Sequence, residues 1–364
     1  MNTRTVNAKI VLLPGDGIGP EVTAEANLLI QAVAEQYDLN LDLQTELIGG
    51  AAIDATGEPL PQKSLDACRA ADAIILGAVG GPKWDDPDSK VRPEQGLLAI
   101  RKELGLYANL RPVRVHPSLA DASPLKPEYL EGVDIMVVRE LTGGSYFGEK
   151  QESDDFASDM CTYSREEIER VVIRAGHIAR DRDSKLHVID KANVMATSRL
   201  WRKVTDDVMR EHFPDVEYEF MLVDAAAMFI ISNPARFKVI VTENMFGDIL
   251  TDETSMLVGS MGMLPSASLG AGKFGMYEPI HGSAPDIAGK GLANPLGMLA
   301  SVAMMFDYSL GRKDIAACID QAISACITEG ACTADLGGNL STSEAGEAVR
   351  KRLDENYQPQ AATG

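Results

Sequence analysis

Apolar and polar positions follow two different periods along this chain of 364 residues. Residues 10–13 form a continuous apolar run, which is typical of a buried strand, and residues 21–36 repeat apolar side chains at helical spacing. Strand-like and helix-like segments alternate nearly throughout, so we predict an α/β fold. Further strands are predicted at 41–47, 73–76, 110–115, 132–139, 186–189, 217–223 and 237–242, and further helices at 92–101, 165–182, 196–211, 296–308 and 314–328.

Three segments depart from this alternation. Residues 148–162 are polar and acidic, and we expect either a hairpin arm or a mobile loop there. The chain from about Leu257 to the helix at 296 is rich in loops, including residues 265–268, and the tail after Tyr357 looks disordered. The length predicts two domains.

The net charge limits the classes of partner. Lys+Arg minus Asp+Glu is 34 − 54 = −20, and so acidic a surface argues against binding nucleic acid or an anionic membrane. An anionic substrate then requires a local group of arginines. The sequence has neither a secretory signal pattern nor an apolar run of membrane-spanning length. The five cysteines lack metal-site or disulfide spacing, so we expect free thiols in a reducing, cytoplasmic setting.

Several motifs count against other functions. Residues 270–275 satisfy Gly-x-Gly-x-x-Gly, but they follow a predicted loop and precede Pro279, where no helix can start cleanly. The strand–turn–helix context of a Rossmann fingerprint is therefore absent. The chain also lacks a Walker phosphate loop and a Gly-x-Ser-x-Gly elbow, which leaves phosphoryl transfer and triad hydrolysis unsupported.

A pair of acids follows the strand at 237–242. Asp248 and Asp252 stand four residues apart in a helix that we expect to begin near Gly247, so their carboxylates project from one face. Mg²⁺ takes oxygen ligands, usually from one or two carboxylates, so the pair provides half of such a site. The same spacing also fits a solvated helix start, where acids favour the positive end of the dipole.

The predicted helix at 92–101 carries an unusual stripe. Glu94, Leu97, Leu98 and Arg101 share one face, whereas an ordinary core stripe would be apolar throughout. Two leucines beside an arginine suit a carboxylate ligand with an aliphatic branch.

More candidate groups gather around predicted strand ends. Arg111 and Arg114 lie three apart on one strand, so only one of them can face a given site. Open α/β sheets place ligands at the carboxyl ends of their strands. The residues near such ends are Arg139, Tyr146, Lys191, Asn193 and Asp224, and Gly80 and Gly81 allow close backbone approach after another strand.

These residues resemble those of a known family, the β-decarboxylating dehydrogenases of the isocitrate/isopropylmalate group. The resemblance extends from residues 15–19 to the helix near Ser301. Its motifs are long and specific: Arg139-Glu-Leu-Thr-Gly-Gly-Ser-Tyr-Phe-Gly148, Asp190-Lys-Ala-Asn193, Asn244-Met-Phe-Gly-Asp-Ile-Leu-Thr-Asp252 and His281-Gly-Ser-Ala-Pro-Asp-Ile-Ala-Gly289.

The resemblance implies a two-domain fold with a mixed central sheet flanked by helices, distinct from the Rossmann fold. It implies a discontinuous cofactor domain, 1–106 plus 257–364, and a substrate, metal and dimerisation domain, 107–256, with an arm near 148–162. It also implies a homodimer with shared active sites, in which Lys191 and Asp224 contribute to the partner subunit's site.

The stripe resembles that of the isopropylmalate branch of the group, which acts in leucine biosynthesis. Isocitrate enzymes carry polar residues where Leu97 and Leu98 stand, and a leucine pair cannot solvate the extra carboxylate of isocitrate. The resemblance therefore implies 3-isopropylmalate as the substrate, and it selects Arg111 over Arg114. The implied substrate contacts are Glu94, Leu97, Leu98, Arg101, Arg111, Arg139 and Asp224.

The resemblance implies cofactor binding on loops. Asp286 is assigned to the ribose, where a carboxylate accepts hydrogen bonds from both hydroxyls but repels a 2′-phosphate, so we expect NAD rather than NADP. The other implied cofactor contacts are Gly80, Gly81, Asn193, His281, Gly282, Ser283, Ala284 and Asn294.

The implied reaction oxidises the 2-hydroxyl and then releases CO₂. Mg²⁺ or Mn²⁺ would be held by Asp224, Asp248 and Asp252. Lys191 would accept the hydroxyl proton, and Tyr146 would protonate the enolate carbon. Two alternatives stay open: a dehydrogenase of the tartrate or D-malate type, and a non-catalytic regulatory subunit of the same fold.

Overall fold

The computed structural model describes residues 7–84, 86 and 89–356, so the tail after Tyr357 lies outside the described residues. The chain divides into two compact units. The second unit comprises residues 101–259 and 268–271, and the first comprises the other described residues. The cofactor and dimerisation roles predicted for two domains stay predictions.

The first unit contains a sheet whose core strand, β3 (Ala73–Ala78), is buried along its whole length. A strand covered on both faces needs a continuous apolar run, and Ile74, Ile75 and Leu76 provide one. β1 is parallel to both β2 and β3, and β12 is parallel to β3. In sheet order the strands are β2 (Asn40–Thr45), β1 (Asn7–Gly15), β3, β12 (Gly275–Pro279) and β11 (Pro265–Leu269).

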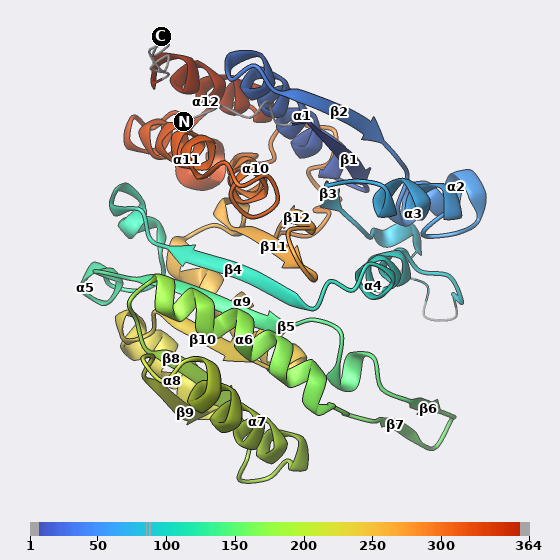
Figure 1. Cartoon of the computed structure of the whole chain (residues 1–364). Helices are drawn as coiled ribbons and strands as arrows, with labels where there is room; N and C mark the ends of the chain where they lie inside the picture. The colour runs from blue at the N-terminus through green and yellow to red at the C-terminus, as the bar shows by residue number, and fades with distance from the viewer. Residues whose placement is uncertain (1–6, 85, 87–88, 357–364) are drawn as a thin grey trace. The chain divides into compact units, whose positions relative to one another are not determined.

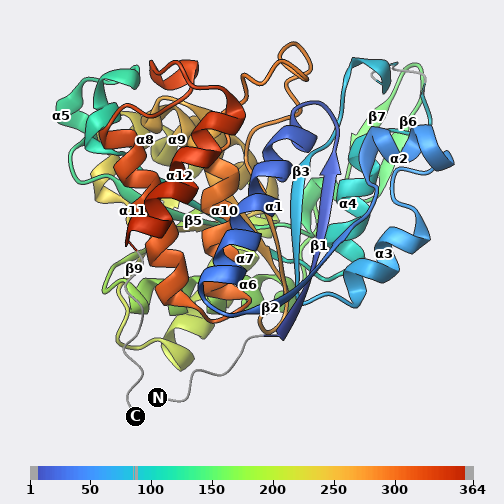
Figure 2. The same cartoon turned by 90° about the horizontal axis from the view of Figure 1, so that it is seen from above.

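Two groups of helices cover this sheet, as Figure 2 shows. α10 is apolar on nearly every side, and its burial explains why it needs no polar face. On one side α1 (Gly19–Gln36) and α10 (Leu296–Tyr308) contact the strands, and α11 (Lys313–Thr328) and α12 (Thr342–Asn356) pack against these two helices. The other side carries α2 (Gly49–Thr56) and α3 (Gln62–Arg69).

The second unit has a mixed set of strands. β4 (Ala108–Arg114) is antiparallel to β5 (Asp134–Glu140), whereas β5 and the three strands that follow it in the sheet pair in parallel. The parallel strands follow in the order β5, β10 (Val239–Thr242), β8 (Leu186–Asp190) and β9 (Tyr218–Leu222). In register, Thr242 of β10 lies opposite Arg139 on one side and Ile189 on the other, so these strands end at one level.

Helices cover both faces of this sheet (Figure 1). α6 (Arg165–Asp181) begins at a capping box of Ser164 and Glu167, and α7 (Ala196–His212) packs beside it. α8 (Val223–Ser232) and α9 (Asn244–Ser255) lie on the opposite face. Residues 148–162 contain the antiparallel hairpin of β6 (Lys150–Glu152) and β7 (Ala157–Asp159), so the hairpin alternative is the one observed.

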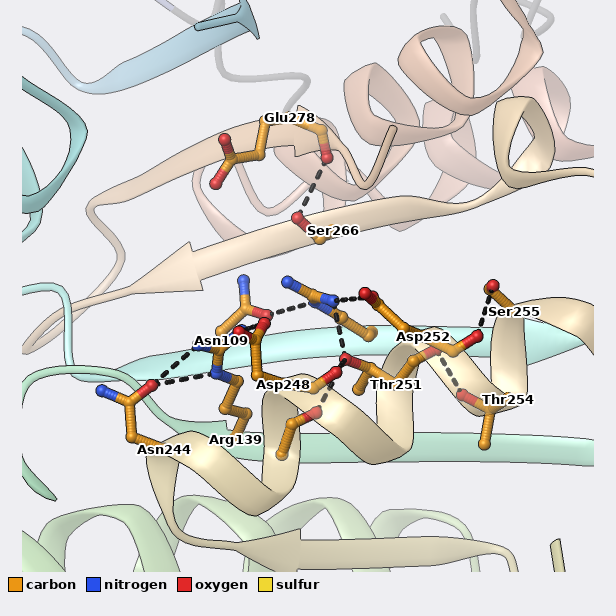
Figure 3. Close-up of polar contacts among 12 residues, drawn as sticks. Asn109, Arg139, Asn244, Asp248, Thr251, Asp252, Thr254, Ser255, Ser266 and Glu278 are labelled. Atoms are coloured by element: carbon orange, nitrogen blue, oxygen red, sulfur yellow. Dashed lines mark hydrogen bonds and ion pairs between the residues drawn. The ribbon is translucent and has the colours of Figure 1, made fainter. Parts of the chain in front are cut away.

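Two predictions need correction. Residues 265–268, expected as a loop, form most of strand β11, because their small hydroxyl side chains find partners inside the fold: Ser266 donates to the Glu278 carbonyl at 3.0 Å (Figure 3). The helix of the acid pair begins at Asn244 rather than near Gly247, because Glu243 caps it by accepting from the Phe246 N–H at 2.8 Å. The chain also forms α2, α3, α8, α12 and β12, none of which the sequence pattern predicted.

The Gly-x-Gly-x-x-Gly segment at 270–275 links β11 to β12, and no helix follows it, as predicted. All five cysteines are free. Within the described part of the chain, no helix is both long enough and apolar enough to cross a membrane.

Candidate active site

The carboxyl ends of β5, β10 and β8 bring three chemically distinct segments to one edge of the second unit. Arg139 lies near the end of β5, α9 begins directly after β10, and Lys191 follows β8. Because these strands are parallel and in register, residues far apart in sequence meet at this edge. The candidate site is built on that arrangement.

The two acids of α9 point to the same side of their helix, as Figure 3 shows. Asp248 is partly covered, whereas the side chain of Asp252 is 70% exposed. Two carboxylates one turn apart, one of them open to solvent, suit a hard divalent cation. Among the described residues, however, no three acidic, histidine or cysteine side chains come together as a metal site, so Asp224 does not join this pair within one chain.

Asp248 is bound by two neighbours. Arg139 forms an ion pair with Asp248 Oδ1, and the Tyr146 hydroxyl donates to Asp248 Oδ2 at 2.8 Å. Tyr146 comes from the short 3-10 turn Gly144–Tyr146 beyond β5. Burial on its own raises the pKa of Asp248, but the charge of Arg139 and the hydrogen bond from Tyr146 lower that pKa overall. Asp248 is therefore ionised at neutral pH.

Burial and the neighbouring charges also shift the pKa values of Tyr146 and Arg139. Burial, together with the neighbouring Asp248, raises the pKa of Tyr146 to about 12, so its hydroxyl keeps its proton at neutral pH. Arg139 is only 3% exposed, and burial lowers its pKa while Asp248 opposes that shift. The Arg139 guanidinium also lies 5.8 Å from the centre of the Tyr146 ring.

Arg111 faces α9 from β4. Its Nε donates to Asn109 Oδ1 at 2.8 Å, its Nη1 donates to Thr251 Oγ1 at 2.6 Å, and it lies 3.6 Å from Asp252. Its side chain is 12% exposed, whereas that of Arg114 is 64% exposed and pairs with Asp134. Only one of the two arginines therefore faces the acids of α9, as the strand geometry predicts.

Lys191 and Asp224 form a separate pair. Lys191 follows β8 and donates from Nζ to Asp224, which lies in the first turn of α8. This hydrogen bond is the main cause of the lowered pKa of Asp224. Asn193, also predicted as a contact, is exposed in the turn after Lys191.

α4 (Pro93–Glu103) buries a face different from its charged stripe. Pro93, Gly96 and Ile100 are its buried residues. Leu97 and Leu98 are only half-buried, and Glu94 is exposed. Two leucines kept off the buried face of a helix are available to contact a ligand.

Apart from Asn193, the predicted cofactor residues lie on two loops of the first unit. Gly80 and Gly81 follow β3, and the segment 281–294 follows β12. In the second loop, His281 Nε2 is buried and has no hydrogen-bond partner, and burial lowers the pKa of this histidine. Ala284 adopts φ +39°, a conformation uncommon outside glycine. Asn294 accepts from the Leu296 N–H at 3.0 Å and donates to Asp335, while Asp286 is exposed.

Sequence reasoning missed two asparagines that orient the arginines. Asn244 Oδ1 accepts from Arg139 Nε at 3.1 Å and Nη2 at 2.8 Å (Figure 3), and Asn109 holds Arg111. The i, i+2 spacing of Asn109 and Arg111 on one strand was a usable signal. The contact of Asn244 with Arg139 spans 105 residues and left no local signal.

Comparison with known proteins gives a consistent result. Residues 9–349 match the family described as isocitrate/isopropylmalate dehydrogenase. The 3-isopropylmalate dehydrogenase of Rhodopirellula baltica is 56% identical over 357 residues, which cover 96% of this chain and 99% of that protein. The enzyme of the same name from Anaeromyxobacter dehalogenans is 57% identical over 353 residues, covering 96% and 100%.

Solved structures agree on the fold. The crystal structure of isocitrate dehydrogenase from Methylococcus capsulatus matches with a TM-score of 0.84 and 33% identity, covering 95% of this chain and 99% of that one. A β-decarboxylating dehydrogenase from Thermococcus kodakarensis in its apo form matches with a TM-score of 0.78 and 33% identity, covering 97% and 99%.

Proposed function

Because the chain belongs to the isocitrate/isopropylmalate dehydrogenase family, we propose that it catalyses the NAD-dependent oxidative decarboxylation of 3-isopropylmalate in leucine biosynthesis. The observation that carries the choice of substrate is the half-buried pair Leu97 and Leu98, which lies beside Arg101 on α4 but off its buried face. An apolar pair stabilises a branched alkyl group and disfavours a third carboxylate. The names of the relatives at 51–57% identity support the same substrate.

The proposed mechanism assigns each step to residues of the chain. Arg101, Arg111 and Arg139 bind the two carboxylates of the substrate through charge-assisted hydrogen bonds. Lys191 accepts the proton of the 2-hydroxyl, and bound NAD⁺ would accept the hydride from the same carbon. After CO₂ departs, the Tyr146 hydroxyl donates its proton to the enolate carbon. A bound divalent cation would polarise the hydroxyl and stabilise developing negative charge on oxygen.

The residues present fit a divalent cation. Asp248 and Asp252 provide two carboxylates on one face of α9, and Mg²⁺ commonly uses one or two carboxylates with water and substrate oxygens. We propose that Asp224 of a second subunit supplies the third acid, because it does not reach the pair within its own chain.

The residues of the first unit also fit NAD. The buried, unpartnered His281 Nε2 lacks the hydrogen bond that an adenine ring could supply. The exposed carboxylate of Asp286 suits ribose hydroxyls and would repel a 2′-phosphate. The proposal therefore prefers NAD over NADP.

A homodimer is proposed from the surface of α8 and α9. Met228, Ile231 and Ile249 are exposed on these two helices, and Val194 is exposed in the turn that follows β8. These apolar residues accompany Asp224 and Asp252, so a second copy covering this surface would bury apolar area and bring acids of two chains together.

The proposal is tested by following NADH formation with 3-isopropylmalate and Mg²⁺. Isocitrate, tartrate and D-malate serve as competing substrates, and NADP⁺ serves as the competing cofactor. We expect metal-dependent turnover with 3-isopropylmalate and NAD⁺ to exceed every other combination by at least about tenfold in kcat/KM. Preferred turnover of tartrate or D-malate would favour the alternative substrate class, and inactivity with every substrate would favour the regulatory subunit.

A further inference from the structure

Asp16 is a buried acid for which the proposed mechanism has no use. It lies in the loop 14–19 between β1 and α1, and it is only 6% exposed. Three backbone N–H groups donate to its carboxylate: Gly50 at 2.8 Å and Gly80 at 2.8 Å to Oδ2, and Ala51 at 2.7 Å to Oδ1. A buried carboxylate is stable only with such donors, and three of them fix its position in the fold.

Two of these bonds cap α2 from a distance in the sequence. Ile48 stands at the N-cap position, and its side chain cannot accept a hydrogen bond. Asp16 supplies the missing acceptor at the positive end of the helix. The fit is close, because a Cβ on Gly49 would lie 2.5 Å from Asp16 Oδ2.

The third bond fixes the loop after β3. Gly80 adopts φ +107°, and its N–H points to Asp16 Oδ2, while the Asp16 N–H donates to the Ala78 carbonyl at 2.8 Å. The ring of Trp84, from the same loop, packs where Gly50 has no side chain: a Cβ there would lie 2.2 Å from the ring. Asp16 and α2 therefore both fix the position of the loop 80–84.

The loop 14–19, which contains Asp16, also contacts the segment after β12. The Ile18 N–H donates to the Ser283 carbonyl at 2.8 Å. Gly17 adopts φ +57°, and a Cβ on it would lie 2.0 Å from the Ser283 carbonyl oxygen. Residues 16–18 thus touch both loops that carry the proposed cofactor contacts, Gly80–Gly81 and 281–286.

We infer that Asp16 is a positioning residue for the dinucleotide, fixing the loop that carries Gly80 and Gly81 relative to the loop that carries Ser283 and Asp286. This inference rests on the proposed use of NAD. A dinucleotide binds both loops at once, so holding them at a fixed separation before binding reduces the entropy lost on binding. Asp16 itself touches neither substrate nor reacting atoms in this account.

The test is Asp16→Asn in the full-length protein. Asparagine keeps the volume but replaces one acceptor oxygen with an NH₂ group, which faces backbone N–H donors. We expect the Kd for NADH, measured by fluorescence titration, and the KM for NAD⁺ to rise about tenfold, while kcat and the KM for 3-isopropylmalate change less than about twofold. A general loss of folding would instead lower kcat through the concentration of active enzyme.

The matched control is Glu25→Gln, which changes another buried acid of the same unit. Glu25 is 5% exposed and pairs with Arg350 of α12. We expect this variant to lose stability but to keep the Kd for NADH of the unmodified protein. Equal Kd values for Asp16→Asn and the unmodified protein would overturn the inference, and so would an equal rise in both variants.

A second measurement needs no variant. Amide hydrogen exchange of the unmodified protein is compared with and without NAD⁺. We expect NAD⁺ to slow exchange at Gly50, Ala51 and Gly80 together with residues 281–286, because Asp16 links these amides to both loops. Slower exchange confined to 281–286 would overturn the inference, whereas failure of NAD⁺ to bind at all would overturn the proposed function instead.

Discussion

At the scale of single residues, the carboxylate of Asp248 connects the other side chains of the candidate site. Arg139 and Tyr146 both bind its carboxylate, and Asn244 holds Arg139 from the other side. A cation placed on Asp248 would compete with both partners for the same oxygens. The acid that would bind the metal thus also orients the proposed proton donor and a proposed substrate clamp.

Tyr146→Phe tests the role of the hydroxyl. The ring and its contact with Arg139 are kept, and only the proton donor is removed. We expect kcat to fall about 10²-fold with little change in the KM for 3-isopropylmalate, because general acid catalysis contributes that order of rate. Steady-state NADH formation measures both constants.

Tyr129→Phe, on an exposed tyrosine of the same unit, is the control and should leave kcat unchanged. An unchanged kcat in Tyr146→Phe would contradict its assignment as the proton donor.

At the scale of elements, α9 depends on a buried acid at its start. Glu243 caps the helix through the Phe246 N–H and accepts from the Tyr163 hydroxyl at 3.2 Å. Burial raises the pKa of Glu243, although the hydrogen bonds at the cap oppose the shift. The folded protein therefore binds this proton more tightly than the unfolded chain does.

This shift has a definite sign for stability. Above the unfolded pKa near 4.5, the folded state holds more protons at this site, so the free energy of unfolding falls as pH rises toward the folded pKa. Glu243→Gln is uncharged at every pH and keeps an amide oxygen for the cap. We expect the stability of the unmodified protein relative to this variant to decrease from pH 4 upward until pH passes the folded pKa, as measured by urea unfolding.

Glu217 has a side chain that is 82% exposed, so Glu217→Gln is the control. The free energy of unfolding of the unmodified protein relative to this variant should change much less over the same pH range. If the free energy of unfolding of the unmodified protein relative to Glu243→Gln instead rose with pH, Glu243 would be stabilised in its charged form.

The leucines on α4 are proposed to contact the alkyl branch of the substrate, and this contact can be tested separately. Leu97→Ala removes apolar contact with the proposed branch, so we expect kcat/KM for 3-isopropylmalate to fall about 10- to 100-fold. D-malate lacks the branch, so its kcat/KM should change far less. Lys102→Ala, at an exposed position of the same helix, is the control. Equal losses for both substrates would show that Leu97 acts through folding rather than through the branch.

Local patterns predicted most elements and part of the site. The pattern of apolar residues was sufficient to predict the strands around residues 10–13 and 73–76 and the helix at 165–182, because a single pattern dominates each of these segments. The acids of α9 were found by their spacing. β11 was missed because Ser266 and Ser268 look polar, yet sheet contacts satisfy both. The roles of Asn244 and Asp16 depend on partners dozens of residues away, which no window of sequence contains.

At the scale of the whole molecule, the proposed active site requires residues from two chains. Asp224 pairs with Lys191 in its own chain and does not join the acids of α9. Asp224→Asn and Asp248→Asn should each be inactive as homodimers. After mixing and exchange of subunits, mixed dimers should regain about half of the normal activity, since one of their two sites contains only unmodified acids.

The recovered activity should scale with the fraction of mixed dimers, measured by native mass spectrometry. Two copies of Asp248→Asn carrying different tags provide the control and should recover nothing. Failure of the mixture to recover activity, despite subunit exchange, would contradict the shared site.

The proposed function requires that this protein oxidises 3-isopropylmalate and removes a carboxylate in the same turnover. Its most direct test is the ratio of CO₂ released to NADH formed, with 3-isopropylmalate, NAD⁺ and Mg²⁺ supplied and the organic product identified by mass spectrometry. We expect one CO₂ for each NADH and 4-methyl-2-oxopentanoate as the product. NADH formation without CO₂, or a product that retains both carboxylates, would contradict it.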